Sequence, residues 1–246
     1  MIIQHLELTN FRNYASATIS LTNGVTAIVG NNGQGKTNLT EALSFLATLK
    51  SFRGVPNEAM IRTGSNSAII RATVVHDDGR EVLIEAELAR VGRNKVQVNR
   101  QKLARTKDLL GVMRTTVFSP EDLDLVKDSP GVRRQFLDDA LVAITPTIDA
   151  LLIEFERVLK QRNALLKQSN GRLTADIATT LDVWDEKFAT LGTELGEHRA
   201  RLVATISPEV SRAYEELAEK ETPIAMIYEP EWRRNGLASE LASNRN

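Results

Sequence analysis

The chain has 246 residues, of which 42% are hydrophobic and 26% charged, and its formal net charge is −1. This composition is typical of a globular protein, and by itself it indicates neither a nucleic-acid partner nor a membrane partner. The absence of cysteine excludes disulfides, thiolate zinc sites and cysteine nucleophiles, and no apolar run is long enough to span a membrane, so we expect a cytoplasmic protein.

Residues 1–117 are predicted to form a mixed lobe that binds nucleotide. Alternating apolar and polar residues, divided by turn sequences such as Asn-Gly and Asp-Asp-Gly, predict a meander of mostly antiparallel strands. The strands are expected at residues 3–9, 17–21, 68–75, 81–89 and 95–98. The apolar run at residues 25–29 follows the Asn23-Gly24 turn and is predicted to be a short buried strand.

The residues after that run match G-x-x-x-x-G-K-[ST], the pattern of the phosphate-binding loop. They are Gly30, Asn31, Asn32, Gly33, Gln34, Gly35, Lys36 and Thr37. Glycines let backbone N–H groups approach phosphate oxygens, and the amphipathic helix predicted for residues 36–49 adds its N-terminal dipole. The motif predicts a nucleoside triphosphate site in which Lys36 reaches the β- and γ-phosphates and the Thr37 hydroxyl holds Mg²⁺.

A second charged segment spans residues 90–107, which contain seven cations and no acid. The cations are Arg90, Arg93, Lys95, Arg100, Lys102, Arg105 and Lys107. Such a local excess of positive charge suits a polyanion, and the segment is a candidate track for a DNA backbone. The alternative is a solvated basic edge that discourages strand-to-strand association.

Residues 118–222 are predicted to form a helical lobe. A Ser or Thr at the N-cap followed by Pro at the first helical position marks four expected helix starts, at Ser119-Pro120, Ser129-Pro130, Thr145-Pro146 and Ser207-Pro208. Apolar residues step by four and three along residues 148–166 and again along 177–202, with Asn170-Gly171 between them. This pattern predicts a short antiparallel helical hairpin, and the polar Arg162 and His198 in its two seams are assigned no function.

Residues 223–246 are predicted to hold one returning strand and a loose C-terminal tail. The strand is expected at residues 224–228, and the residues from Arg233 onward are polar and without periodicity.

Nucleotide hydrolysis requires an acid at the end of a buried strand and a group that activates water. The acids of residues 136–139 lie on a predicted helix, and residues 224–229 have strand character but only one acid. Neither segment is accepted as a Walker B element, and no signature loop of the Ser-x-Gly-Gln type is found. We therefore assign no catalytic residue and expect a weak ATPase at most.

Three stretches together resemble the RecF family. They are Leu6-Glu7-Leu8-Thr9-Asn10-Phe11-Arg12-Asn13-Tyr14, the loop of residues 30–37 with the following Asn38-Leu39-Thr40-Glu41-Ala42, and the segment from Val117 to Asp138. The third stretch, with Pro120, Pro130, Arg133-Arg134 and Phe136-Leu137-Asp138, is the specific one. The resemblance covers about residues 1–230.

The resemblance implies an α/β fold in which an ABC/SMC-type P-loop NTPase lobe joins a helical lobe. It also implies a protein that binds ATP, dimerises around it and binds DNA at gaps. Its expected partners are RecR- and RecA-type proteins in DNA replication, recombinational repair and the SOS response to DNA damage. By the same resemblance, Arg12 and Arg53 lie near the nucleotide, and residues 118–122 match the loop that links the two lobes.

Two departures from the family pattern concern its C-terminal motifs and one turn. The signature loop and the Walker B acids are missing, and Asp128 stands where the pattern has glycine, just before the helix expected at Pro130. Two other functions remain open: a small-molecule phosphotransferase built on the same loop, and the head fragment of a structural SMC protein. The first would need an arginine-bearing lid, and the second a much longer coiled coil.

Overall fold

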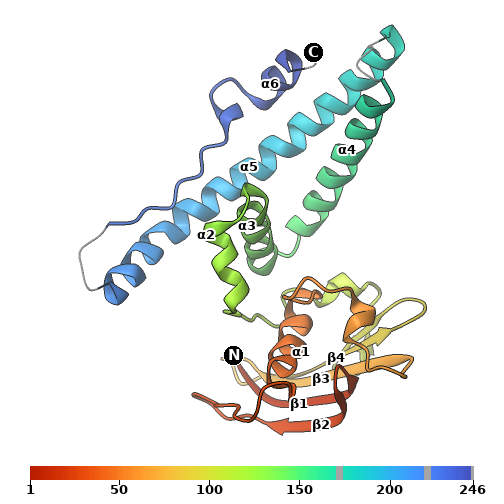
Figure 1. Ribbon diagram of the computed structural model, residues 1–246, viewed down its shortest axis with the longest axis vertical. Helices are drawn as coiled ribbons and strands as arrows, with labels where there is room; N and C mark the ends of the chain where they lie inside the picture. The colour runs from red at the N-terminus through yellow and green to blue at the C-terminus, as the bar shows by residue number, and fades with distance from the viewer. Residues whose placement is uncertain (170–173, 219–222, 245–246) are drawn as a thin grey trace. The chain divides into compact units, whose positions relative to one another are not determined.

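A computed structural model describes residues 1–169, 174–218 and 223–244, and the chain divides into two compact units, Met1–Ser129 and Pro130–Asn246 (Figure 1). The predicted boundary, after residue 117, lies twelve residues before the observed one, after residue 129. The difference arises because a 3₁₀ helix, Pro120–Leu123, and the short helix α2, Asp124–Lys127, belong to the first unit. Among the helices of the described ranges, none has the length and apolar character needed to cross a membrane.

The first unit contains a six-stranded sheet in which every neighbouring pair of strands is antiparallel. The strand order is β2-β1-β3-β4-β5-β6. The strands are β1 Ile2–Phe11, β2 Tyr14–Ser20, β3 Ser67–Val75, β4 Glu81–Ala89, β5 Lys95–Val98 and β6 Gln101–Lys102. The predicted antiparallel meander is confirmed, and β6 is an addition to it.

One face of the sheet is buried against helix α1, Lys36–Thr48, as Figure 1 shows. Along β3 every second residue is buried, with Ile70 and Val74 fully so, which is the period of a strand with one covered face. Phe45 and Leu46 of α1 complete this core. The covered face fixes the register of the sheet, because a shift by one residue would turn these apolar side chains to the other face.

The opposite face of the sheet is polar. Arg71 on the central strand β3 pairs with Glu7 on β1 and with Glu85 on β4, and the three residues stand directly opposite one another in the ladder. Cross-strand charge pairs of this kind suit a solvated face.

The prediction of a buried strand at residues 25–29 is wrong. This segment has no regular structure, and Val25 and Val29 are 100% and 88% exposed. The physical reason is that a strand is stable only beside neighbours that accept its backbone hydrogen bonds, and no strand of the described residues pairs with this segment.

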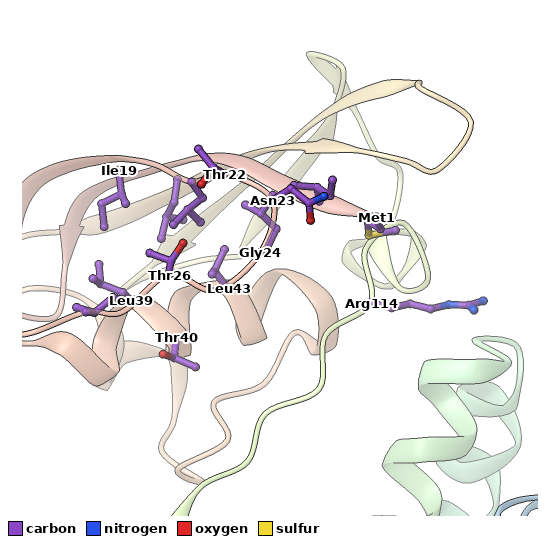
Figure 2. Close-up of a pocket in the computed structure, with 15 residues that line it drawn as sticks. Met1, Ile19, Thr22, Asn23, Gly24, Thr26, Leu39, Thr40, Leu43 and Arg114 are labelled. Carbon is purple, nitrogen blue, oxygen red and sulfur yellow. The ribbon is translucent and has the colours of Figure 1, made fainter. Parts of the chain in front are cut away.

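An apolar pocket of about 360 Å³ lies beside this segment. Figure 2 shows Leu39 and Leu43 of α1 on one wall, Ile19 of β2 on another, and Thr26 of the irregular segment between them. The pocket is therefore lined jointly by the irregular segment, by α1 and by strands β1 and β2.

The second unit is helical. Its helices are α3 Pro130–Ile144, α4 Ile148–Ser169, α5 Ala175–Leu217 and the short α6 Leu237–Ser243. The predicted start at Pro130 is confirmed, whereas α4 begins two residues after the predicted Pro146. In the first unit, Pro120 starts a 3₁₀ helix in place of the expected α-helix.

The predicted antiparallel hairpin is formed by α4 and α5. Phe155 of α4 stacks on Phe188 of α5, with ring centroids 4.9 Å apart, and further along α4 Arg162 pairs with the earlier Asp185 of α5. Rising numbers on one helix meet falling numbers on the other, so the helices run in opposite directions. The polar Arg162 is thus a structural member of the seam, paired with a buried carboxylate.

The expected helix start at Pro208 is wrong, because α5 runs through it without interruption. Proline inside a helix removes one backbone hydrogen bond, but Leu202, Val203 and Ile206 pack into one apolar cluster as the helix approaches it. The Ser207 hydroxyl does not cap a helix; it accepts a hydrogen bond from the backbone N–H of Met226 at 3.3 Å.

Two expectations for the C-terminal part are also wrong. Residues 224–228 are assigned no strand; they run beside α5, where the Ile224 carbonyl accepts from the Ser211 hydroxyl at 2.8 Å. The tail after them is not loose through residue 243, because α6 packs on α5. Two glycines one turn apart on α5 make this possible: Leu237 lies against Gly192, and Trp232 against Gly196.

Candidate nucleotide site

The predicted phosphate-binding loop leads directly into the N-terminus of α1. Gly35 is the residue before the helix and has φ 98°, a left-handed conformation that favours glycine. No side chain caps this end of α1, and its first turn holds no acid. The N–H groups of the first helical turn therefore meet no side-chain acceptor, which is the arrangement of an anion site.

The side chain of Lys36 folds back over the loop. Its Nζ donates to the carbonyl oxygens of Gly30 and Asn31, at 2.7 and 2.8 Å. The loop is also closed on itself by Gln34, whose Oε1 accepts from the backbone N–H of Asn31 at 3.1 Å. The hydrogen bonds of the Lys36 ammonium go only to the loop, so this charge is placed for a ligand and not for the core.

Thr37 is the residue expected to hold Mg²⁺. It lies on the first turn of α1, is exposed, and forms no hydrogen bond through its hydroxyl with another described residue. A hydroxyl in that position fits a magnesium ion that takes its other ligands from phosphate and water. Among the described residues, no group of three or more His, Asp or Glu side chains gathers to hold a metal.

Asn13, in the turn between β1 and β2, braces the loop from outside. Its Nδ2 donates to the Gln34 carbonyl at 3.0 Å, and its Oδ1 accepts from Asn38 of α1 at 2.9 Å. A Cβ on Gly35 would lie 2.4 Å from Asn13 Oδ1, so the side chain packs directly on that glycine. Sequence reasoning missed Asn13 because its role depends on a turn that is distant in the chain.

Arg12 and Arg53, which the sequence placed near the nucleotide only by resemblance, meet at one buried carboxylate of α1. Arg12 donates through Nε and Nη2 to Glu41, at 2.7 and 2.6 Å, and Arg53 Nη1 lies 3.6 Å from the same carboxylate. Glu41 is completely buried. Sequence reasoning missed Glu41, although its place on α1 five positions after Lys36 could be read from the motif.

The ionisation of Glu41 follows from these contacts. Burial raises its pKa, but hydrogen bonds from Arg12 and Ser51 and the charges of Arg12 and Arg53 lower it more, so the pKa lies below its ordinary 4.5. Glu41 is therefore a carboxylate at neutral pH, and with the two arginines it makes a cluster of net charge +1 beside the loop.

The seven cations of residues 90–107 differ in what they contact. Four have partners: Arg90 donates to the Ser65 carbonyl, Lys95 pairs with Glu87, Arg105 pairs with Asp108, and Lys107 is also engaged. Three are exposed and have no partner among the described residues: Arg93, Arg100 and Lys102. Arg100 stands with Asn99 in the two-residue turn between β5 and β6, where both have positive φ.

Asp138 of the rejected segment 136–139 and the seam residue His198 both have partners within the protein. Asp138 on α3 is bonded by both Nε and Nη2 of Arg199 on α5, at 2.8 and 2.7 Å. His198 meets Arg201 through Nδ1 at 3.1 Å, one turn away on the same helix.

Two further expectations concern the end of the first unit. In residues 118–122, the Asp122 carboxylate accepts from the Ser119 N–H at 2.5 Å and closes the turn. Asp128 accepts from the N–H of Ser129, and it is not among the described residues with positive φ. The turn before Pro130 therefore does not require the glycine of the family pattern.

A phosphate-binding loop at the N-terminus of a helix, on an antiparallel sheet and followed by a helical unit, defines a P-loop nucleotide-binding protein of the ABC/SMC type. The family model described as "RecF/RecN/SMC N terminal domain" matches residues 2–218, and the chain belongs to that family. The fold class predicted from the sequence is confirmed.

Relatives and solved structures agree with this placement. A protein named DNA replication and repair protein RecF, from Streptomyces avermitilis, is 46% identical over 94% of this chain and 62% of its own length. The structure described as recombination mediator protein RecF-ATP in the RecFOR pathway has a TM-score of 0.85 at 27% identity, over 98% of this chain and 66% of its own. A second such structure, described as RecF-ATPrS in the RecFOR pathway, has a TM-score of 0.82 at 29% identity, over 88% of this chain and 58% of its own.

The chain is thus similar to RecF proteins over most of its own length, but it spans only 62% of the Streptomyces relative.

Proposed function

We propose that this chain binds ATP in the loop of residues 30–37 and acts as an ATP-gated DNA-binding protein of RecF type in DNA replication and recombinational repair. The observation that carries the proposal is the uncapped N-terminus of α1 beneath a glycine loop, in a chain that is similar to RecF structures whose descriptions include ATP. A helix end of this kind offers N–H groups to phosphate oxygens.

In the proposed complex, the ammonium of Lys36 exchanges its two loop carbonyls for phosphate oxygens, which are stronger acceptors because they are charged. The Thr37 hydroxyl would hold Mg²⁺, and the ion would supply positive charge that neutralises the phosphates. Arg12 and Arg53 supply the positive charge beside the loop.

DNA binding is proposed for the β4-β5-β6 edge of the sheet. Arg93, Arg100 and Lys102 are exposed there, and their charges are not neutralised by an acid of the described residues. The remaining four cations of residues 90–107 support this edge through their own contacts. The seven-cation track of residues 90–107 stays a prediction, and within it we propose these three cations as the ones most available to phosphate.

The broader setting is proposed from the similarity to RecF. It comprises binding at single-strand and double-strand gaps, an ATP-dependent homodimer, partners of RecR and RecA type, a cytoplasmic location and a role in the SOS response. ATP turnover by the chain alone is proposed to be slow, because we assign no catalytic acid. Of the two other readings, the phosphotransferase and the SMC head fragment, neither gains an observation from the described residues.

The test of the proposed function is ATP binding by wild type and by Lys36→Ala, measured calorimetrically with Mg²⁺. Wild type should bind, and Lys36→Ala should lose binding while its circular dichroism and thermal midpoint stay close to those of wild type, because the hydrogen bonds of Lys36 go only to the loop. Lys160→Ala, which removes an exposed lysine from α4, is the matched control. Unchanged affinity in a folded Lys36→Ala variant would refute the assignment.

A further inference from the structure

Glu41 is a completely buried carboxylate on the second turn of the helix that begins at the phosphate-binding loop. A buried charge is costly unless it is fully paired and hydrogen-bonded. Three side chains satisfy Glu41: Arg12 with two bonds, Ser51 with one at 2.5 Å, and Arg53 at 3.6 Å. Its partners come from two separate segments of the first unit: Arg12 follows β1, and Ser51 and Arg53 follow α1.

Arg12 is held in one place by these contacts. Its backbone has φ 53°, a left-handed conformation that is unfavourable for arginine. The conformation is maintained because the Arg12 N–H donates to the Met60 carbonyl and its Nη1 donates to the Ala59 carbonyl, both at 2.8 Å. With Nε and Nη2 fixed by Glu41, the orientation of the guanidinium plane is determined from two sides.

Arg53 is positioned by the same carboxylate through a relay. The Ser51 hydroxyl donates to Glu41 and accepts from the Arg53 backbone N–H at 3.1 Å. The Arg53 guanidinium in turn donates to Asn38, which is bonded to the loop-bracing Asn13. The two arginines, α1 and the turn that supports the loop therefore form one connected network.

We propose that Glu41 is the positioning residue of the nucleotide site: its carboxylate aims Arg12 and Arg53 beside the phosphate-binding loop and so increases the affinity for the triphosphate. The inference rests on the proposed function, because it assumes that nucleotide binds at residues 30–37. Glu41 is buried, and it acts through the two arginines rather than by touching the ligand.

Charge and position predict opposite effects for Glu41→Gln. The substitution removes a negative charge near an anion site, so a role as mere counter-charge predicts tighter ATP binding. A positioning role predicts weaker binding, because the amide no longer holds Arg12 by two charge-assisted bonds. A purely structural role predicts a lower thermal midpoint with unchanged affinity in the folded protein.

The experiment measures the ATP dissociation constant of the full chain with Mg²⁺ for wild type, Glu41→Gln, Arg12→Ala and the double variant. We expect Glu41→Gln to weaken binding roughly tenfold, about the effect of one misdirected charge-assisted hydrogen bond. In the Arg12→Ala background, Glu41→Gln can weaken ATP binding only through Arg53. The combined loss of affinity in the double variant should therefore be smaller than the product of the two single losses. Glu85→Gln is the matched control, because it also removes an arginine-paired carboxylate but on the polar face of the sheet.

Tighter or unchanged ATP binding by a folded Glu41→Gln variant overturns the proposal, as do fully multiplicative effects in the double variant. If Glu41→Gln does not fold, Ser51→Ala decides, because it removes only the relay hydroxyl. A loss of about threefold supports the proposal, and unchanged affinity overturns it. If the proposed function itself is wrong, the wild type will show no ATP binding that depends on Lys36, and this result is distinct from a failure of the Glu41 proposal.

Discussion

The salt dependence of DNA binding tests how many cations of residues 90–107 contact phosphate. Each phosphate contact on duplex DNA contributes roughly −0.9 to the slope of log K against log salt. Arg93, Arg100 and Lys102 have no partner among the described residues, so the structure gives a slope of about −2.7 for one copy of the chain. Lys95 and Arg105 are not counted, because contact with phosphate would require them to leave Glu87 and Asp108. Arg90 and Lys107 are not counted either, because each already has a contact within the protein.

The variant that tests this count is Arg100→Ala with Lys102→Ala. It should weaken binding and flatten the slope to about −0.9, with little change in sequence preference. The measurement is fluorescence anisotropy with a labelled gapped duplex at several salt concentrations, with and without ATP.

The control for this variant is Arg157→Ala with Arg212→Ala. It removes the same formal charge from the helical unit, where both arginines pair with glutamates on their own helices. The control should keep the wild-type slope. Equal flattening by both double variants would show a net-charge effect and refute the site, and a wild-type slope near −4.5 would show that paired cations also reach phosphate.

Three further predictions concern acid stability, the C-terminal segment and turnover. Because the folded-state pKa of Glu41 is lowered, the stability that its charge contributes is complete above the ordinary pKa of 4.5 and is lost as the pH falls through the lower folded-state value. In urea unfolding, the difference in stability between wild type and Glu41→Gln should therefore shrink below about pH 4.5. A difference that stays constant with pH would contradict this. Gly196→Ala places a Cβ 2.6 Å from the Trp232 ring, so in a Trp184→Phe background it should displace that ring and shift its fluorescence to the red, whereas an unchanged spectrum would refute the packing. Phosphate release by the pure chain should be very slow, and rapid release that Lys36→Ala abolishes would reveal a catalytic acid that we have missed.

The local elements of this protein could be predicted from the sequence because their causes are local. The alternation of residues 68–75 and 81–89 is the two-residue period of a strand with one covered face, and the structure keeps it residue by residue. The loop at residues 30–37 was evident from its glycines, lysine and threonine, since the chemistry of phosphate binding imposes those residue types. The hairpin of α4 and α5 followed in the same way from apolar spacing.

The errors arose where a segment depends on a distant neighbour. Residues 25–29 have the composition of a buried strand but lack a pairing strand among the described residues. Residues 224–228 have the same composition, but they run as irregular chain beside helix α5. Ser207-Pro208 has the composition of a helix start, yet the apolar packing just before it carries α5 through the proline. In each case local preference was overridden by what the segment packs against.

The sequence by itself thus determined the class of fold and the loop that defines the candidate site, because both are written in consecutive residues. Only the tertiary structure decided which charges are available around that site. It paired Lys95 and Arg105 with acids and gave Arg90 and Lys107 other contacts, and it brought Arg12 and Arg53 together on Glu41. The physical reason is that a charge is neutralised or aimed by the nearest partner in space, and residues as far apart in the chain as Arg12 and Glu41 become neighbours only when the sheet packs on α1.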